Sequence, residues 1–277
     1  MSTEPSPTSY PQGWSVPQGE VHELSPRAHR YCLLIPVINE GERILAQLAR
    51  VRDVGADVDV VVADGGSTDG SNDPEVLRGL GVSTLIVKRD TGRLSAQLRL
   101  GMAHALQQGY DGVITVDGNG KDDVAAVPSF VRALEEGAGF VQGSRYVPGG
   151  QAVNTPRSRD LAIKLVHAPV TTLAARKRYT DTTNGFRGHS AALLRDPRVA
   201  PFRDVFDSYE LLAYLPIRAA RLGYRCLELP VTRAYPATGA TPTKIHGLGA
   251  QLDLLKILGT AAVGGYDPRP APAAAAS

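Results

Sequence analysis

The amino-acid sequence predicts an α/β protein in which helices flank a mostly parallel sheet. Segments typical of strands and of helices alternate between residues 31 and 143, which is the pattern that a parallel sheet produces. The chain is 43% apolar and 21% charged, a globular composition that excludes a collagen, a coiled coil or a disordered chain. Its 277 residues leave room for one large α/β domain or two small ones.

Five strands are expected where short apolar, β-branched runs stop at Pro, Gly or polar residues. The run from Tyr31 to Ile35 stops at Pro36, as a buried strand that leads into a loop does. The expected strands cover residues 31–35, 58–63, 84–87, 112–116 and 140–143.

Helices are expected between these strands, where apolar residues recur every three or four positions. Between residues 40 and 54 they stand at Ile44, Leu45, Leu48 and Val51. Further helices are expected over residues 73–80, 94–108, 124–136 and 247–259, and from Tyr209 onward.

The two ends of the chain lack this periodicity. Five prolines predict that residues 1–28 form a flexible arm, and the Pro/Ala-rich residues 267–277 predict a disordered tail. Residues 29–266 are then expected to form a single domain. No signal peptide or membrane span is recognisable, and two cysteines cannot make a disulfide framework. We therefore expect a cytoplasmic protein, in contact with the inner face of the membrane at most peripherally.

Polar, often Gly-containing segments follow four of the expected strands. They cover residues 36–40, 64–66, 88–90 and 117–119. Because the carboxyl ends of parallel strands meet at one edge of the sheet, these segments predict a ligand site at that edge.

Charge is distributed unevenly along the chain, although the net charge is only +2. Residues 1–150 carry 13 Lys and Arg against 19 Asp and Glu, and residues 151–277 carry 17 against 9. An acidic half joined to a basic half favours metal or polar-ligand contacts in the first and anion contacts in the second.

Five motifs occur in the order and spacing of family 2 glycosyltransferases, and the sequence resembles that family over about residues 30–246. The last motif, Asp181–Arg187, is similar to one of the polyprenyl-phosphate branch, which includes enzymes like dolichyl-phosphate mannose synthase. The motifs cover residues 36–40, 64–70, 117–119, 143–146 and 181–187.

The resemblance implies a GT-A fold and an inverting transfer of a sugar from a nucleotide-diphosphate sugar. The residues that it assigns to the nucleotide sugar are Pro36, Asn39, Glu40, Asp64, Gly65, Arg93, Asp117, Gly118 and Asn119. The residues expected to contact phosphate or acceptor are Lys121, Arg145, Arg159, Asn184, Gly185, Arg187, Arg233 and Lys244. The partners implied are a nucleotide-sugar donor and a polyprenyl phosphate or small-molecule acceptor, with no nucleic acid.

The metal motif of the family is altered in this sequence. Asp117 matches the first acid, which implies Mg²⁺ or Mn²⁺ on Asp117 and Asn119, with Asp122 or Asp123 as helpers. Asn119 however replaces the second acid, and the ammonium of Lys121 follows two residues later. A metal-independent mode, in which Lys121 supplies the charge, therefore remains open.

The acceptor decides whether a general base is needed. A phosphate acceptor is already anionic, whereas a hydroxyl acceptor needs a carboxylate within hydrogen-bond reach. Asp181 and Glu210 are the candidates for that base, and Glu210 is also placed to stabilise the start of a helix.

Two other functions fit part of the pattern. A sugar nucleotidyltransferase shares a nucleotide-binding edge with acidic ligands, but it needs an early basic phosphate loop that residues 36–42 lack. A degenerate sugar-nucleotide-binding protein is suggested by Asn119 in place of an acid.

Overall fold

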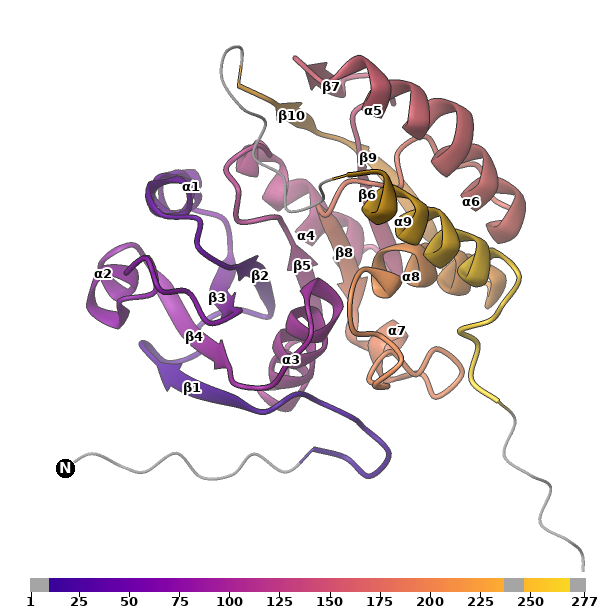
Figure 1. Cartoon of the computed structure of the whole chain (residues 1–277). Helices are drawn as coiled ribbons and strands as arrows, with labels where there is room; N and C mark the ends of the chain where they lie inside the picture. The colour runs from indigo at the N-terminus through magenta and orange to yellow at the C-terminus, as the bar shows by residue number, and fades with distance from the viewer. Residues whose placement is uncertain (1–9, 237–246, 270–277) are drawn as a thin grey trace, which may run out of the picture.

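The computed structural model describes residues 10–236 and 247–269, which fold around one large sheet (Figure 1). The strands are β1 (Gly19–Glu23), β2 (Tyr31–Val37), β3 (Val58–Asp64), β4 (Val82–Lys88), β5 (Gly112–Thr115), β6 (Phe140–Ser144), β7 (Gln151–Val153), β8 (Arg187–Ser190), β9 (Cys226–Pro230) and β10 (Thr232–Ala234). The helices are α1 (Glu42–Val54), α2 (Pro74–Gly79), α3 (Leu94–Gln107), α4 (Val127–Glu135), α5 (Arg157–Ala162), α6 (Ala168–Ala175), α7 (Ala191–Arg195), α8 (Glu210–Arg221) and α9 (Gly247–Ala262). A 3₁₀ turn (Val124–Ala126) precedes α4, and a π-helical turn (Ile163–His167) joins α5 to α6.

The large sheet has the strand order β1-β4-β3-β2-β5-β8-β6-β9, which confirms the predicted mostly parallel architecture. Within it β4, β3, β2 and β5 run parallel, and β6 runs parallel to β9. All five strands expected from the sequence are present, within three residues of the expected ends. A separate two-stranded ribbon pairs β7 with β10.

Apolar side chains fill both faces of the sheet, because successive residues of a strand point to opposite sides. Cys32 and Leu34 of β2 pack with residues of α3 and α8, whereas Leu33 and Ile35 pack with residues of α1 and α4. The three adjacent strands β4, β3 and β2 are buried along their whole length, as expected of parallel strands covered on both faces.

Residues 10–28 are folded against the domain, which corrects the expectation of a flexible arm for this part of the chain. The strand β1 pairs with β4 in antiparallel register. Trp14 stacks on Phe202 with ring centroids 4.0 Å apart, and the N–H of Ser15 donates to the carbonyl of Phe202 at 2.7 Å. Tertiary contacts thus order a segment whose own sequence has little periodicity. Residues 1–9 lie outside the described part of the chain.

One antiparallel strand brings a distant segment to the ligand edge of the sheet. The strand β8 lies between β5 and β6 and runs against both. An antiparallel strand begins where its neighbours end, so residues 181–186, which precede β8, lie beside residues 117–121, which follow β5. The edge at the carboxyl ends of the parallel strands is called the rim below.

Candidate active site

The first part of the rim is a loop built around Asp64, at the end of β3. Asp64 is fully buried, and its carboxylate accepts the backbone N–H groups of Gly66 and Ser67, each at 2.8 Å. The amide oxygen of the exposed Asn39, which has a φ of 48°, accepts the N–H of Thr68 at 2.8 Å. Asp64 thus shapes the loop from inside, whereas Asn39 holds the loop at the surface. Among the other residues expected to contact the nucleotide, Pro36 is buried within β2, and Glu40 forms a 3.0 Å ion pair with Arg43.

Two buried glutamines that no sequence motif marks fix the rim loops. Gln97 of α3 donates to the carbonyls of Val37 and Ala63, at the ends of two adjacent strands. Gln47 of α1 donates to the carbonyl of Asp117 at 3.0 Å and accepts the N–H of Gly120 at 2.7 Å. The available signal was position: Gln47 stands on the apolar face of its helix, between Ile44 and Leu48.

Asp117 lies in the centre of the rim, against the segment that precedes β8. A Cβ on residue 185 would lie 2.2 Å from Asp117 Oδ1, so only glycine allows this approach. A Cβ on residue 118 would lie 2.5 Å from a methyl carbon of Val37. The expected residues Asp117, Gly118 and Gly185 are therefore brought together, and the Asp117 side chain remains 25% exposed.

Arg233 joins this centre from the other end of the chain. Its guanidinium contacts Asp117 Oδ2 at 2.9 Å and Asp122 Oδ2 at 2.5 Å. Burial by itself would lower the pKa of Arg233, but Asp122 and Asp117 together raise it above the usual value. The guanidinium therefore stays charged and ties the loop after β5 to β10.

Arg145 and Asp181 form a second, fully buried ion pair beside it. The Arg145 guanidinium donates to both carboxylate oxygens of Asp181, at 2.6 and 2.9 Å, and to Thr183 Oγ1 at 3.0 Å. Glu228 accepts the backbone N–H groups of Thr180 and Asp181. In this arrangement Asp181 holds a loop together and offers no oxygen to an acceptor hydroxyl.

Arg187 has a structural role, which corrects its expected contact with the acceptor. It is 1% exposed and donates to the carbonyls of Thr182, Asn184 and Leu212 at 2.7–3.0 Å. Burial lowers the pKa of Arg187 to about 10. All three donating nitrogens face the interior, so a ligand at the surface does not reach them.

Replacing Arg187 with Lys should therefore lower the free energy of unfolding by about 2–4 kcal/mol and leave the KM for the acceptor nearly unchanged. One ammonium cannot reach all three carbonyls, and each unpaired buried carbonyl costs about 1–3 kcal/mol. Urea denaturation and steady-state kinetics measure the two effects. A normally stable variant with a raised acceptor KM would restore the expected binding role.

Three cationic side chains surround the ring of Tyr235, the residue that directly follows β10. Lys121 Nζ lies 5.1 Å from the ring centroid, and the guanidinium carbons of Arg159 and Arg233 lie 5.8 and 5.9 Å from it. Arg159 also donates to the Tyr235 hydroxyl at 2.9 Å. Burial and the neighbouring Arg233 lower the pKa of Lys121. Lys121, which is 6% exposed, and the half-buried Arg159 thus form a positively charged group beside the Asp117 centre.

Glu210 stabilises the start of α8, one of the two roles expected for it. Its Oε2 accepts the backbone N–H of Ser208 at 2.6 Å. The preceding residue, Tyr209, lies within electrostatic reach of Arg93 and Asp117, and burial raises the pKa of its hydroxyl. Arg93 is exposed at the start of α3, where its N–H donates to the carbonyl of Asp207 at 2.9 Å.

Two expected asparagines lie near Asp117 and Arg233. Asn119 is half-buried beside Asp117, and its Oδ1 accepts the N–H of Lys121 at 3.3 Å. Asn184 is buried, with its Oδ1 3.4 Å from Arg233 Nη1. Lys244 lies outside the described residues.

The oxygen atoms at the rim fit a divalent cation only if the substrate supplies further ligands. No group of three or more His, Cys, Asp or Glu side chains within residues 10–236 and 247–269 is arranged to hold a metal. The partly exposed Asp117 carboxylate and the Asn119 amide are hard oxygen donors, and Mg²⁺ commonly combines one or two carboxylates with substrate phosphates. The residues therefore fit a site that a nucleoside diphosphate completes.

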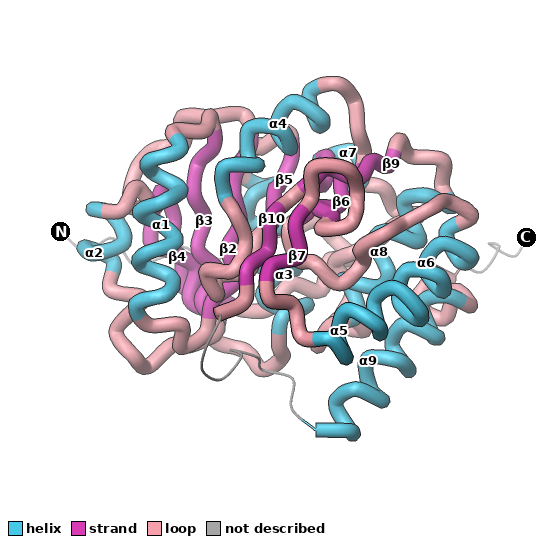
Figure 2. Tube along the Cα trace, turned by 90° about the horizontal axis from the view of Figure 1, so that it is seen from above, coloured by secondary structure: helices cyan, strands magenta, loops and turns pink. Residues whose placement is uncertain are grey.

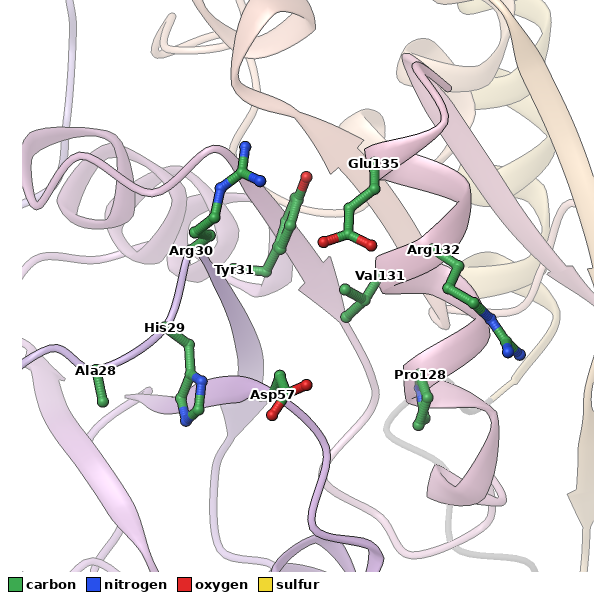
Figure 3. Close-up of a pocket in the computed structure, with 9 residues that line it drawn as sticks. All are labelled: Ala28, His29, Arg30, Tyr31, Asp57, Pro128, Val131, Arg132 and Glu135. Carbon is green, nitrogen blue, oxygen red and sulfur yellow. The ribbon is translucent and has the colours of Figure 1, made fainter.

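A pocket of about 410 Å³ lies at the opposite edge of the sheet, away from this centre. Figure 3 shows Arg30 and Tyr31 at the start of β2, Asp57 before β3, and Arg132 and Glu135 of α4 around it. Its charges are mixed, and Arg30 is already paired with Asp111 at 2.7 Å. The acid–base and cationic groups described above all lie at the rim, so we place the candidate active site there.

Known proteins resemble this chain in sequence and in fold. The family model described as Glycosyl transferase family 2 matches residues 32–198. The undecaprenyl-phosphate mannosyltransferase of Micrococcus luteus is 32% identical over 207 residues, which cover 73% of this chain and 83% of that protein. The polyprenol monophosphomannose synthase of Mycolicibacterium smegmatis is 26% identical over 206 residues, 73% of this chain and 77% of that protein.

Solved structures with little sequence identity share the fold. Glucosyl-3-phosphoglycerate synthase from Mycobacterium tuberculosis, in complex with Mn²⁺, UDP and glucosyl-3-phosphoglycerate, has a TM-score of 0.61 at 16% identity. The match covers 87% of this chain and 81% of that one. The same synthase with Mg²⁺ and UDP also has a TM-score of 0.61, at 17% identity, with 87% and 80% covered. The predicted GT-A fold is confirmed.

Proposed function

Because the chain belongs to glycosyl transferase family 2, and is thus a nucleotide-sugar-dependent glycosyltransferase, we propose that it transfers a sugar to a polyprenyl phosphate at a membrane surface. The names of the two relatives make mannose the first sugar to test. The choice of a lipid acceptor over a soluble one rests on one observation: an exposed apolar surface next to the cations of the site.

That surface is formed by α5, the π-helical turn, α6 and α9 with the residue that follows it. Figure 2 shows α9 alongside α5 and α6 at one side of the molecule, and α6 and α9 are in contact. The side chains of Leu165, Leu173 and Leu252 are 69%, 79% and 65% exposed. We call the following set the apolar surface: Leu161, Leu165, Val166, Leu173, Leu252, Leu255 and Val263.

The charge around the apolar surface suits an anionic membrane. Within residues 157–178 and 247–262 only two acids, Asp160 and Asp253, stand among the basic residues. The basic residues are Arg157, Arg159, Lys164, Arg176, Lys177, Arg178 and Lys256. Amphipathic helices with apolar and basic residues bind in the interface of anionic bilayers. No helix in the described residues is long and apolar enough to cross a bilayer.

The helix α5 connects the apolar surface with the site. Arg159 donates to Tyr235 at the rim, and Leu161, two residues later, is 55% exposed. A polyprenyl phosphate whose chain lies in the membrane would thus present its phosphate to Arg159. The presence of a cation of the site and an exposed leucine on one short helix supports a lipid acceptor.

The reaction follows from the charges at the rim. The bond between the anomeric carbon and the donor diphosphate breaks, its electron pair stays on the diphosphate, and an acceptor phosphate oxygen bonds to the opposite face of that carbon. The configuration is therefore inverted. Lys121 is placed to stabilise the negative charge that develops on the departing diphosphate, and Arg159 is placed toward the acceptor phosphate. An anionic acceptor needs no base, which is compatible with the engagement of Asp181 by Arg145 and of Glu210 by Ser208.

We further propose that Asp117 and Asn119 hold Mg²⁺ or Mn²⁺ together with the donor diphosphate. When bound there, the cation would neutralise part of the diphosphate charge. The structures of the related synthase hold Mn²⁺ or Mg²⁺ together with UDP, which supports a cation in such a site.

The test combines vesicle binding with transfer. Vesicles containing anionic lipid and a polyprenyl phosphate should bind the protein and receive sugar from GDP-mannose or another nucleotide sugar of a panel. Leu165→Glu and Leu252→Glu should each weaken vesicle binding by about tenfold or more, because burying one leucine contributes about 1.5–3 kcal/mol. Transfer to a short, water-soluble prenyl phosphate should persist in both variants.

Val76→Glu is the matched control, because Val76 is 45% exposed on α2, which is not part of the apolar surface. It should bind vesicles like the wild type. Transfer to a soluble hydroxyl compound without transfer to prenyl phosphates would reject the lipid acceptor. Release of pyrophosphate, or tight nucleotide-sugar binding without turnover, would instead favour a nucleotidyltransferase or a binding protein.

A further inference from the structure

Tyr235 is the one aromatic residue in the described chain whose ring lies within 6 Å of three cationic groups. The cations come from separate segments: Lys121 follows β5, Arg159 belongs to α5, and Arg233 belongs to β10. The charge of Arg159 contributes, after burial and Arg233, to lowering the pKa of Lys121. Something must therefore hold two like charges together at the rim.

The Tyr235 side chain can do so in two different ways. The face of its ring attracts the Lys121 ammonium, 5.1 Å from the centroid, as cations and aromatic faces attract each other within about 6 Å. Its hydroxyl oxygen accepts a hydrogen bond from Arg159 Nη1 at 2.9 Å. One residue thus contacts the loop after β5 through its ring and the helix α5 through its oxygen.

The backbone of Tyr235 is fixed independently of these contacts. Its N–H donates to the carbonyl of Val153 at 3.0 Å, and its carbonyl accepts from Asn154 Nδ2 at 3.2 Å. The residue is 3% exposed. Burial raises the pKa of its hydroxyl, but Arg233 and Arg159 together bring the pKa below its usual value, in keeping with a hydroxyl whose oxygen faces cations.

We propose that Tyr235 is a positioning residue that aligns a donor-side cation, Lys121, with an acceptor-side cation, Arg159. The ring sets the position of Lys121 toward the donor diphosphate, and the hydroxyl sets that of Arg159 toward the acceptor phosphate. This proposal rests on the proposed function, because it assigns the two cations to the two phosphate groups of that reaction.

Two substitutions separate the two contacts. Tyr235→Phe keeps the ring and removes the oxygen, so the KM for a short prenyl phosphate should rise about tenfold while nucleoside-diphosphate affinity stays unchanged. Tyr235→Leu removes both contacts, so it should raise that KM similarly and also weaken nucleoside-diphosphate binding about tenfold. A hydrogen bond to a charged group typically strengthens binding by about tenfold or more. Calorimetry with UDP and GDP and steady-state kinetics provide the two readouts.

Tyr224→Phe is the control, because it removes a hydroxyl bonded to Asp196 at 2.8 Å, in a part of the chain outside the rim. Its KM and nucleotide affinity should match the wild type. A purely structural role for Tyr235 predicts lower thermal stability in both variants with no separation of acceptor KM from nucleotide affinity, and that result would overturn the proposal. Wild-type protein that binds a nucleoside diphosphate but transfers no sugar would refute the proposed function. In that case the affinities for UDP or GDP and for a short prenyl phosphate, measured by calorimetry on both variants, still test Tyr235.

Discussion

Replacing Asp117 with Asn should reduce kcat by about a hundred- to a thousandfold and remove the effect of Mg²⁺ on nucleoside-diphosphate binding. Asp117 is the carboxylate that the structure leaves partly exposed at the centre of the rim, whereas Asp122 and Asp181 are buried in ion pairs. An amide has nearly the same shape but no charge, so it weakens a divalent cation that is shared with the diphosphate.

Calorimetric titration of UDP and GDP, with Mg²⁺ and with EDTA, measures this effect separately from turnover. Asp111→Asn is a suitable control, because Asp111 flanks the other end of β5 and pairs with Arg30 at the opposite edge. Full wild-type turnover in EDTA would reject the metal and favour charge supplied by Lys121 alone.

Asp181→Asn should lower the free energy of unfolding by about 3–5 kcal/mol. Removing one partner of a buried ion pair leaves the other charge uncompensated, and Arg145 is 3% exposed with its Nη1 already without a hydrogen bond. Urea denaturation measures the loss, and an unchanged slope with urea concentration shows that the folded state is still compact.

A double variant tests the physical reason. Combining Asp181→Leu with Arg145→Met removes both charges, and it should recover part of the stability that Asp181→Asn loses. An Asp181→Asn protein of normal stability but without transfer activity would contradict this account and would restore Asp181 as a general base.

The parallel core of the fold was predictable because each of its strands can be recognised from its own residues. Val58–Ala63 contains four valines and one charged residue, Asp59, so the burial of most of this strand follows from its own composition. The strand β8, by contrast, reads Arg-Gly-His-Ser and contains no apolar run. The strand β8 is ordered by its pairing with β5 and β6, so no local sequence pattern predicted it. The same holds for β1, which becomes a strand by pairing with β4.

The parts of the site that directly follow strands were predictable. The contacts between residues far apart in the sequence were not. Asp117, Gly118 and Asn119 follow β5 directly, so their place at the rim follows from the topology. The ion pair between Asp117 and Arg233 joins residues 116 positions apart, and no spacing rule connects them. Arg187 was expected to contact the acceptor and is buried instead, because a motif does not show whether a side chain faces a ligand or the interior.

The segment 145–186 leaves the sheet after β6 and returns to it at β8, and its two ends are fastened together. The N–H of Gly143 donates to the carbonyl of Phe186 at 2.8 Å, and Arg145 pairs with Asp181. Closing such a loop costs little more when its length changes, because the entropy varies only with the logarithm of length. A change in the length of the segment that carries α5 and α6 should therefore cost little loop entropy, with the pairing of β8 with β5 and β6 left intact.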